Sequence, residues 1–270
     1  MHIYFFRMEI AGYIAAILIG ISLGLIGGGG SILTVPVFVY MMHVNPVLAT
    51  TYSLFVVGSC SLVGGTRAYL KGAIDLPAVL YFGLSSMVTV FIVRTWVVTA
   101  IPDYFTIGDI AITKGIFLMV LFAVLMLVAA VSMIQSDRKK TETPVKEHSR
   151  IPGLLMQGTL VGVVTGLLGA GGGFLIIPAL VLFSRLPMKT AVGSSLTIMA
   201  FSSLFGFFTT LSQHTINWLQ LLSFTAIAIL GIFIGAALSE KIPGTALKRG
   251  FGWFVFIMGI SILIREIFFS

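Results

Sequence analysis

Charged residues are scarce in this chain. Asp, Glu, Lys and Arg together make up 9% of its 270 residues, whereas hydrophobic residues make up 58%. A soluble domain carries about 25% charged residues, and the mean hydropathy of +1.10 points the same way. We therefore predict a polytopic membrane protein of the all-α class.

Cysteine and membrane-embedded acids are also lacking. Cys60 is the single cysteine, which excludes a disulfide framework and a multi-cysteine metal site, so no metal and no cofactor are expected. The nine acids lie at the ends of apolar segments, in loops or in a linker. Their absence from the centres disfavours a pump that works through a buried carboxylate. Protons as a coupling ion stay open, through His43, His214 or a protonatable substrate.

The net charge of +7 does not indicate a nucleic-acid partner. The cations sit in short loops between apolar runs, as membrane orientation requires. No cleavable signal is expected either, because residues 1–9 lead into an apolar span without a small-residue cleavage site.

Glycine is concentrated in two matching blocks. Gly24–Pro36 (GLIGGGGSILTVP) comes back 142 residues later as Gly166–Pro178 (GLLGAGGGFLIIP), with seven of thirteen positions identical. Gly costs a helix about 1 kcal/mol relative to Ala, so both runs are expected to break one. Two such breaks in matching positions of two halves indicate a transporter's central binding site. Close helix packing, as in GxxxG interfaces, is the alternative.

The apolar segments fall at about 9–26, 31–42, 46–66, 76–98, 112–134, 152–168, 174–184, 190–211, 217–238 and 249–268. A helix needs about 20 apolar residues to cross a bilayer. Segments 31–42 and 174–184 are shorter, so we expect each to pair with the segment before it across the glycine break, as a re-entrant hairpin or as two half-helices. The predicted architecture is one membrane domain with two repeats, residues 1–134 and 151–270, each with four long apolar segments and one half-helix.

Residues 135–150 form a polar linker with five cations, which the positive-inside rule places in the cytoplasm. Counting spans outward from it puts both termini outside. Equivalent loops then take opposite sides, since the cationic Arg67–Lys71 aligns with the uncharged Thr209–Gln213. This alternation is typical of inverted-topology repeats, whose two glycine breaks would enter from opposite faces and meet.

The expected chemistry is the binding of an oxyanion. A half-helix that begins at Ser31 or Phe174 presents backbone N–H groups and the positive end of its dipole, which together bind anions. Hydroxyls beside the breaks, at residues 50–53 and 193–195, are candidate donors, although such hydroxyls often bond to their own helix. The candidate substrate-binding residues are Gly27, Gly28, Gly29, Gly30, Ser31, Thr50, Thr51, Ser53, Arg94, Gly169, Gly171, Gly172, Gly173, Ser194 and Ser195.

Arg94 is a candidate because it is the one charged residue well inside an apolar segment. An intramembrane charge suggests a function, but its side chain can also snorkel to the outer interface. Cys60 is either a small apolar filler or a residue that faces a sulfur-containing substrate.

Each glycine block is followed by an Ala-x-x-x-Ser-Leu element, at Ala49–Leu54 and Ala191–Leu196. In these features both halves, and nearly the whole chain, resemble the TauE/SafE family of sulfite exporters. The resemblance implies a multi-pass permease of the plasma (inner) membrane for sulfite or related small organosulfur anions. It also implies that the glycine blocks and these elements line the path. Tyr52 stands where the second half has Ser194, which is a departure from a symmetric site.

The preferred hypothesis is a secondary transporter, an exporter that works by alternating access, with the sulfur-containing anion and the lipid bilayer as partners. A passive anion channel with the same fold is the first alternative. The second is an intramembrane enzyme, which would need a nucleophile with a base, or a metal cluster, at membrane depth. The sequence offers neither, so no catalytic residue is expected.

Overall fold

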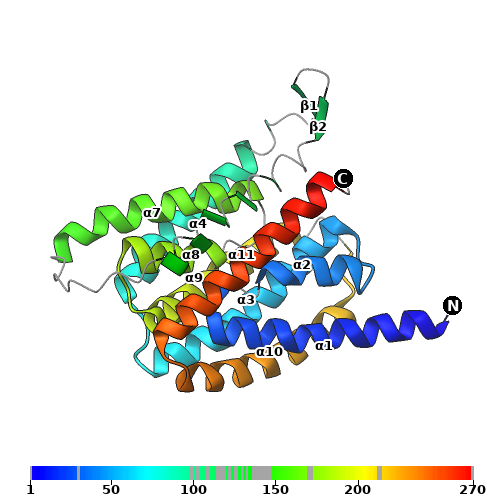
Figure 1. Ribbon diagram of the computed structural model, residues 1–270, viewed down its shortest axis with the longest axis horizontal. Coiled ribbons are helices and arrows are strands. Elements are labelled where there is room, and N and C mark those ends of the chain that lie inside the picture. Colours follow the sequence, from blue (N-terminus) through cyan, green and yellow to red (C-terminus); the bar gives the residue numbers. More distant parts are fainter. Residues whose placement is uncertain are drawn as a thin grey trace.

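A computed structural model describes residues 2–28, 31–97, 100, 104–107, 110–113, 120, 123–124, 127–128, 130–131, 133–135, 147–168, 173–211 and 215–268. This part of the chain is helical apart from one short hairpin (Figure 1). The predicted linker, residues 135–150, lies mostly outside it.

The first half contains α1 (His2–Ile26), α2 (Ser31–Tyr40) and α3 (Pro46–Leu70), followed by a composite span of the π-helical turn η2 (Ala78–Phe82), α4 (Gly83–Ile92) and the π-helical turn η3 (Val93–Val97). These elements match the predicted segments. The strands β1 (Tyr104–Ile107) and β2 (Ile110–Thr113) then pair antiparallel. The fifth segment was expected to begin at about 112, but residues 112 and 113 belong to β2, whose β-branched residues favour a strand. The described residues between 120 and 135 are helical.

The second half contains α7 (Glu147–Leu168), α8 (Gly173–Pro178), the π-helical turn η4 (Ala179–Phe183), α9 (Met188–Thr210), α10 (Trp218–Lys241) and α11 (Gly244–Phe268). The five predicted segments of this half correspond to these elements, with α8 and η4 together forming the short one.

Among the described residues, five helices are long and apolar enough to cross a membrane: Leu48–Leu70, Ala78–Val97, Met188–Thr209, Trp218–Lys241 and Thr245–Ile264. Two shorter apolar helices, Ala11–Ile26 and Ile151–Gly166, accompany them. This supports the prediction of a polytopic membrane protein.

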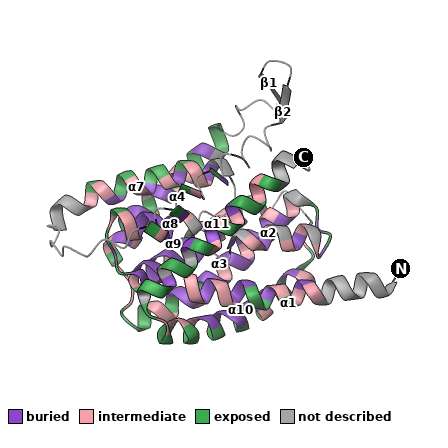
Figure 2. Cartoon of the chain, in the orientation of Figure 1, coloured by how far each residue is buried: buried purple, intermediate pink, exposed green. Residues whose placement is uncertain are grey.

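Helices α3 and α9 form the centre of the molecule (Figure 2). Of their spans, 67% and 61% of the residues are buried, against 24–39% in the other three. Gly58 of α3 lies against Leu204 of α9, and Gly64 lies against Leu196. Since the α9 numbers fall as the α3 numbers rise, the two helices pack antiparallel.

The contacts between α3 and α9 recur with the roles of the two helices exchanged. Gly64 faces Leu196, and Gly206 faces Leu54, so each partner is replaced by the residue 142 positions away. The contact of Gly65 with Thr197 corresponds in the same way to the contact of the Phe207 and Phe55 rings, whose centroids are 4.9 Å apart.

Helices α1 and α10 lie side by side (Figure 1) and touch through their backbones. Gly20 and Gly24 of α1 meet Gly231 and Gly235 of α10, and a Cβ atom on any of the four would overlap the partner helix. This small-xxx-small spacing lets membrane helices approach closely. The equivalent glycines of α7 pack on the composite span 78–97, Gly162 against the backbone of Ser86 and Gly166 against the side chain of Val93.

The turns before α3 and before α9 also agree. His43 and Arg185 have φ values of 53° and 54°, and they are the non-glycine residues with positive φ in the described part of the chain. Each turn is closed by a backbone hydrogen bond, in which Val44 donates to Phe38 at 2.9 Å and Leu186 donates to Leu180 at 3.0 Å.

Aromatic rings fill the two halves unequally. The ring of Phe38 lies 5.4 Å from that of Tyr52 and 4.4 Å from that of Phe224, which is itself 6.5 Å from the ring of Tyr13. The residues 142 positions away from these four are Leu155, Leu180, Ser194 and Phe82. One end of the molecule therefore has four packed rings where the equivalent positions have one.

Candidate functional site

The first glycine break interrupts the chain between α1 and α2. Helix α1 ends at Ile26, and the N–H of Gly27 donates to the carbonyl oxygen of Leu23 at 2.8 Å. Gly27 has a φ of +72°, a conformation that favours glycine. Helix α2 begins at Ser31, as expected. Gly29 and Gly30 lie outside the described residues.

The second break lies between α7 and α8. Helix α7 ends at Leu168 and α8 begins at Gly173, one residue before the expected Phe174. Gly169, Gly171 and Gly172 lie outside the described residues.

The two breaks touch each other. A Cβ atom on Gly28 would overlap the backbone of Gly173, and one on Gly173 would lie 2.8 Å from the Cα atom of Gly28. Real Cβ atoms essentially never come within 3.0 Å of another heavy atom. The breaks are therefore in backbone contact, with space for a hydrogen atom and no more.

One face of α9 covers this contact. A Cβ atom placed on Gly27 would lie 3.0 Å from the Ser195 hydroxyl oxygen, 3.3 Å from Val192 and 3.0 Å from Ile177 of α8, and Met199 lies against Gly173. Our sequence reasoning missed Val192, Ile177 and Met199. The spacing of residues 192, 195 and 199 places them on one helical face, and that spacing would have found two of the three.

Two candidate hydroxyls donate to backbone carbonyls at the site. The Ser31 hydroxyl donates to the carbonyl oxygen of Gly28 at 2.7 Å, and that of Ser195 donates to Val192 at 2.9 Å. Both serines are buried. In this conformation the two hydroxyl protons bond within the first break and within α9, while the starts of α2 and α8 present backbone N–H groups.

Ser194 and Tyr52 have the same role at opposite ends of the core, although their side chains differ. The hydroxyl oxygen of Ser194 accepts a hydrogen bond from the Asp75 N–H at 2.9 Å, and that of Tyr52 accepts one from the Asn217 N–H at 2.6 Å. The side chains of Asp75 and Asn217 in turn cap the next helical segment, because they accept from the N–H groups of Ala78 and Gln220. The two residues hold equivalent loops.

The remaining candidates lie on α3 and on η3. Thr51 and Ser53 are buried and Thr50 is half-buried. Ser53 is the residue equivalent to Ser195 in the first half. The backbone of Arg94 belongs to η3, but its side chain lies outside the described part.

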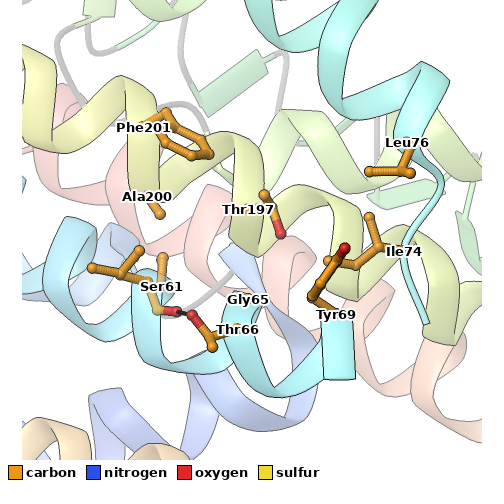
Figure 3. A pocket seen from close by; sticks show the side chains of 10 residues that line it. Ser61, Gly65, Thr66, Tyr69, Ile74, Leu76, Thr197, Ala200 and Phe201 are labelled. Atoms are coloured by element: carbon orange, nitrogen blue, oxygen red, sulfur yellow. Dashed lines mark hydrogen bonds between the residues drawn. The ribbon is translucent and has the colours of Figure 1, made fainter. Parts of the chain in front are cut away.

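A cavity of about 180 Å³ lies between α3 and α9, and Ser61, Gly65 and Thr197 contribute to its lining (Figure 3). The hydroxyl oxygen of Ser61 is buried without a hydrogen-bond partner among the described residues. Thr197 is two residues from Ser195, about 200° around α9. The cavity therefore lies on the face of α9 opposite to the glycine breaks.

The described residues at the breaks carry no formal charge. Within the described part of the chain, there is also no group of three or more His, Cys, Asp or Glu side chains that could hold a metal ion. What the arrangement offers to a ligand is backbone dipoles, hydroxyl groups and apolar walls.

Comparison with known proteins gives similarities over nearly the whole length. A family model described as "Sulfite exporter TauE/SafE" matches residues 13–262. A "Probable membrane transporter protein" of Xylella fastidiosa is 30% identical over 92% of both chains. The "Probable membrane transporter protein YunE" of Bacillus subtilis is 25% identical over 95% of this chain and 99% of its own. No solved structure gives a significant match.

Proposed function

The chain belongs to the TauE/SafE family, and from that premise we propose that it exports sulfite or a related small organosulfur anion across the plasma membrane by alternating access. Family membership and the named relatives make the protein a membrane transporter and point away from an enzyme. Our proposal goes further in three respects: the sulfur-containing anion, the outward direction and the secondary-transport mechanism.

The contact between the two glycine breaks carries the proposal. Gly28 and Gly173 touch through their backbones, and the half-helices α2 and α8 begin at Ser31 and at Gly173. Helix starts direct unpaired N–H groups and partial positive charge at whatever lies before them. Two such starts beside one contact suit an oxyanion, which needs several donors at once.

We further propose that residues 1–134 and 151–270 are inverted-topology repeats joined by a cytoplasmic linker, residues 135–150. The antiparallel packing of α3 on α9 supports this, because equivalent helices of inverted repeats run in opposite directions. The exchanged contact pairs at the 142-residue offset support it too. Rocking one repeat against the other would then expose the site to each side of the membrane in turn.

The uncharged surroundings suit transport better than tight capture. Ile177, Val192 and Met199 give the site apolar walls, and a bound anion would be held by dipoles alone. Because no fixed cation is present among the described site residues, release does not require a strong ion pair to be broken. Such moderate binding is what a carrier or channel needs for turnover.

A flux measurement in proteoliposomes tests the proposal with the variant Gly28→Val. A valine side chain would collide with Gly173, and overpacking costs about 1–3 kcal/mol or more, so we expect sulfite flux to fall by about tenfold or more. Gly250→Val on α11 is the matched control, because a Cβ atom there meets nothing within 4 Å.

Wild-type flux in Gly28→Val, with the protein folded as judged by its elution as a single species, would contradict the role given to the breaks. Saturation of the wild-type flux with sulfite concentration distinguishes a carrier from the channel alternative. Flux that rises linearly without saturation would favour the channel.

A further inference from the structure

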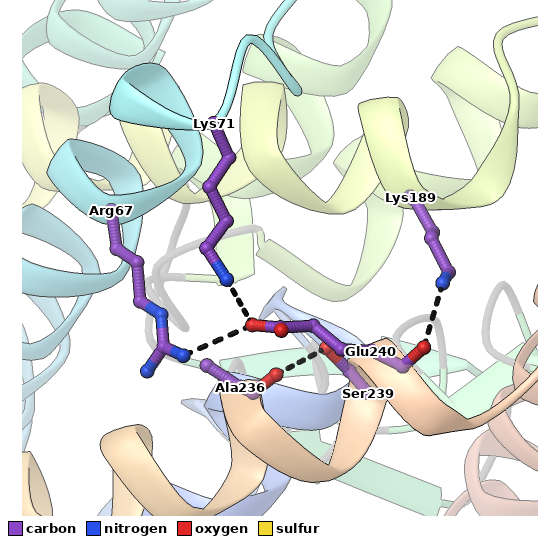
Figure 4. A network of polar contacts seen from close by, with 6 residues as sticks. All are labelled: Arg67, Lys71, Lys189, Ala236, Ser239 and Glu240. Carbon is purple, nitrogen blue, oxygen red and sulfur yellow. Dashed lines mark hydrogen bonds and ion pairs between the residues drawn. The ribbon is translucent and has the colours of Figure 1, made fainter.

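Four charged residues meet at one end of the helical core, where α3, α9 and α10 come together (Figure 4). The Arg67 guanidinium nitrogen Nη2 lies 3.0 Å from the Oε1 oxygen of Glu240, and Lys71 Nζ contacts the same oxygen. Lys189 Nζ donates to the backbone carbonyl oxygen of Glu240 at 3.2 Å. Three cations thus surround one acidic residue. We call these four residues the cation cluster.

The cation cluster carries excess positive charge. Three cations and one carboxylate leave two positive charges without compensation within it. The side chains of Arg67, Lys71 and Glu240 are 29%, 45% and 50% exposed, and ion pairs as exposed as these are weak. The carboxylate is therefore held only weakly by the two side chains that contact it.

The fold does not require this cluster. The residues 142 positions away are Thr209, Gln213, Val47 and Val98, and none of them is charged. Membrane orientation accounts for cations in the loops at this end. It does not account for their convergence, from two different helices, on one glutamate.

We propose that Arg67 and Lys71 form a capture site for small oxyanions, in which the carboxylate of Glu240 occupies the position that an incoming anion takes. Lys189, on the backbone side of Glu240, adds a third positive charge beside it. This inference rests on the proposed anion transport. A guanidinium group donates to two oxygens of one anion at once, and an ammonium group adds a compact charge. Sulfite and other small sulfur oxyanions present oxygens in that way.

The position of the cation cluster suits delivery to the glycine breaks. Lys189 lies six residues before Ser195 on α9, which is about 9 Å along a helix axis. Ser195 lies against Gly27 at the first break. An excess of positive charge at the mouth of a path raises the local concentration of anions, and Glu240 competes with each anion that arrives.

Sulfite flux into inside-out membrane vesicles, measured at low ionic strength against sulfite concentration, tests the capture site. Glu240→Gln removes the internal competitor, so we expect the half-saturating concentration to fall by about three- to fivefold at an unchanged maximal rate. Arg67→Gln and Lys71→Gln should raise it. Lys241→Gln, which removes one exposed cation at the same helix end outside the cluster, should leave it unchanged.

If Glu240→Gln changes the maximal rate but not the half-saturating sulfite concentration, the capture site is overturned. That result would identify the cluster as a set of ion pairs that hold the helices together. An equal effect of Lys241→Gln and Arg67→Gln would also overturn it, since overall charge would then suffice.

Binding to the purified protein separates this inference from the proposed function. Sulfite should raise the thermal unfolding midpoint, with half the effect at a lower concentration in Glu240→Gln than in the wild type. If wild-type vesicles show no sulfite flux, the proposed function fails. If flux is present and this midpoint titration is the same in both proteins, the capture site alone fails.

Discussion

At the scale of single residues, the pair Tyr52 and Ser194 shows what sequence reasoning reaches and where it stops. The sequence identifies them as equivalent but different, and the difference suggests an asymmetric site. In the structure both accept a hydrogen bond from a loop N–H. That role depends on Asp75 and Asn217, which lie more than one hundred residues away along the chain. The spacing of residues around Tyr52 and Ser194 therefore could not predict these hydrogen-bond partners.

We expect Tyr52→Phe to lower the stability of the protein. It removes the acceptor of the Asn217 N–H while keeping the buried ring, and the net loss of one hydrogen bond is about 1 kcal/mol. In detergent the thermal unfolding midpoint should fall by about 2–4 °C. Ser194→Ala should have a similar effect through Asp75. Tyr69→Phe, at a tyrosine that is 61% exposed, serves as the control, and an equal fall there would contradict the assigned role.

At the scale of helices, most bounds could be predicted because hydrophobic runs and glycine breaks are local properties of the sequence. The half-helices α2 and α8 begin at Ser31 and Gly173, within one residue of expectation. The hairpin Tyr104–Thr113 was missed, because its apolar residues resemble the start of a helix. The pairing of α1 with α10 could not be predicted from the sequence either. Many glycines have the required spacing, and which helices pack together depends on the tertiary structure.

We expect Gly20→Leu to separate α1 from α10. A side chain at this position would overlap the backbone of Ala228, and overpacking of this kind costs about 1–3 kcal/mol or more. The fraction of protein that stays soluble and monodisperse after heating, read by size-exclusion chromatography, should drop at a lower temperature than in the wild type.

The equivalent variant Gly162→Leu should behave in the same way, because a side chain there would meet the carbonyl oxygen of Ser86. Gly250→Leu is the control, at a position open to at least 4 Å. An unchanged melting profile for Gly20→Leu would show that the helices are not held by this backbone contact.

At the scale of the whole molecule, the cation cluster brings together basic residues from the ends of different helices. Arg67, Lys71, Lys189 and the end of α10 come together there. The contacts show that these helix ends share one end of the protein. Which face of the membrane that end occupies follows from the positive-inside rule alone, and it is a prediction.

Reporter fusions check that prediction. A reporter that is active only outside the cytoplasm should be silent when fused at Pro144 in the linker and active when fused at Ser270. The reason is that the basic residues of the linker, residues 135–150, oppose its translocation across the membrane. A second reporter, active only in the cytoplasm, should give the reverse pattern, and activity of the first reporter at Pro144 would invert the whole topology.

The unequal aromatic filling of the two ends has a thermodynamic consequence. A carrier with two identical repeats would have inward-facing and outward-facing states of equal free energy. Here Tyr13 and Tyr52 pack on neighbouring rings where the other repeat has Leu155 and Ser194. Under the proposed alternating access, each of the three ring contacts (Phe38 with Tyr52, Phe38 with Phe224, and Tyr13 with Phe224) that opens in the other facing would favour the present state by about 0.5–1.5 kcal/mol. If all three open, the bias of the empty protein would be about one to three orders of magnitude. On that proposal, the empty carrier would rest in one facing, and each transport cycle would return to that state.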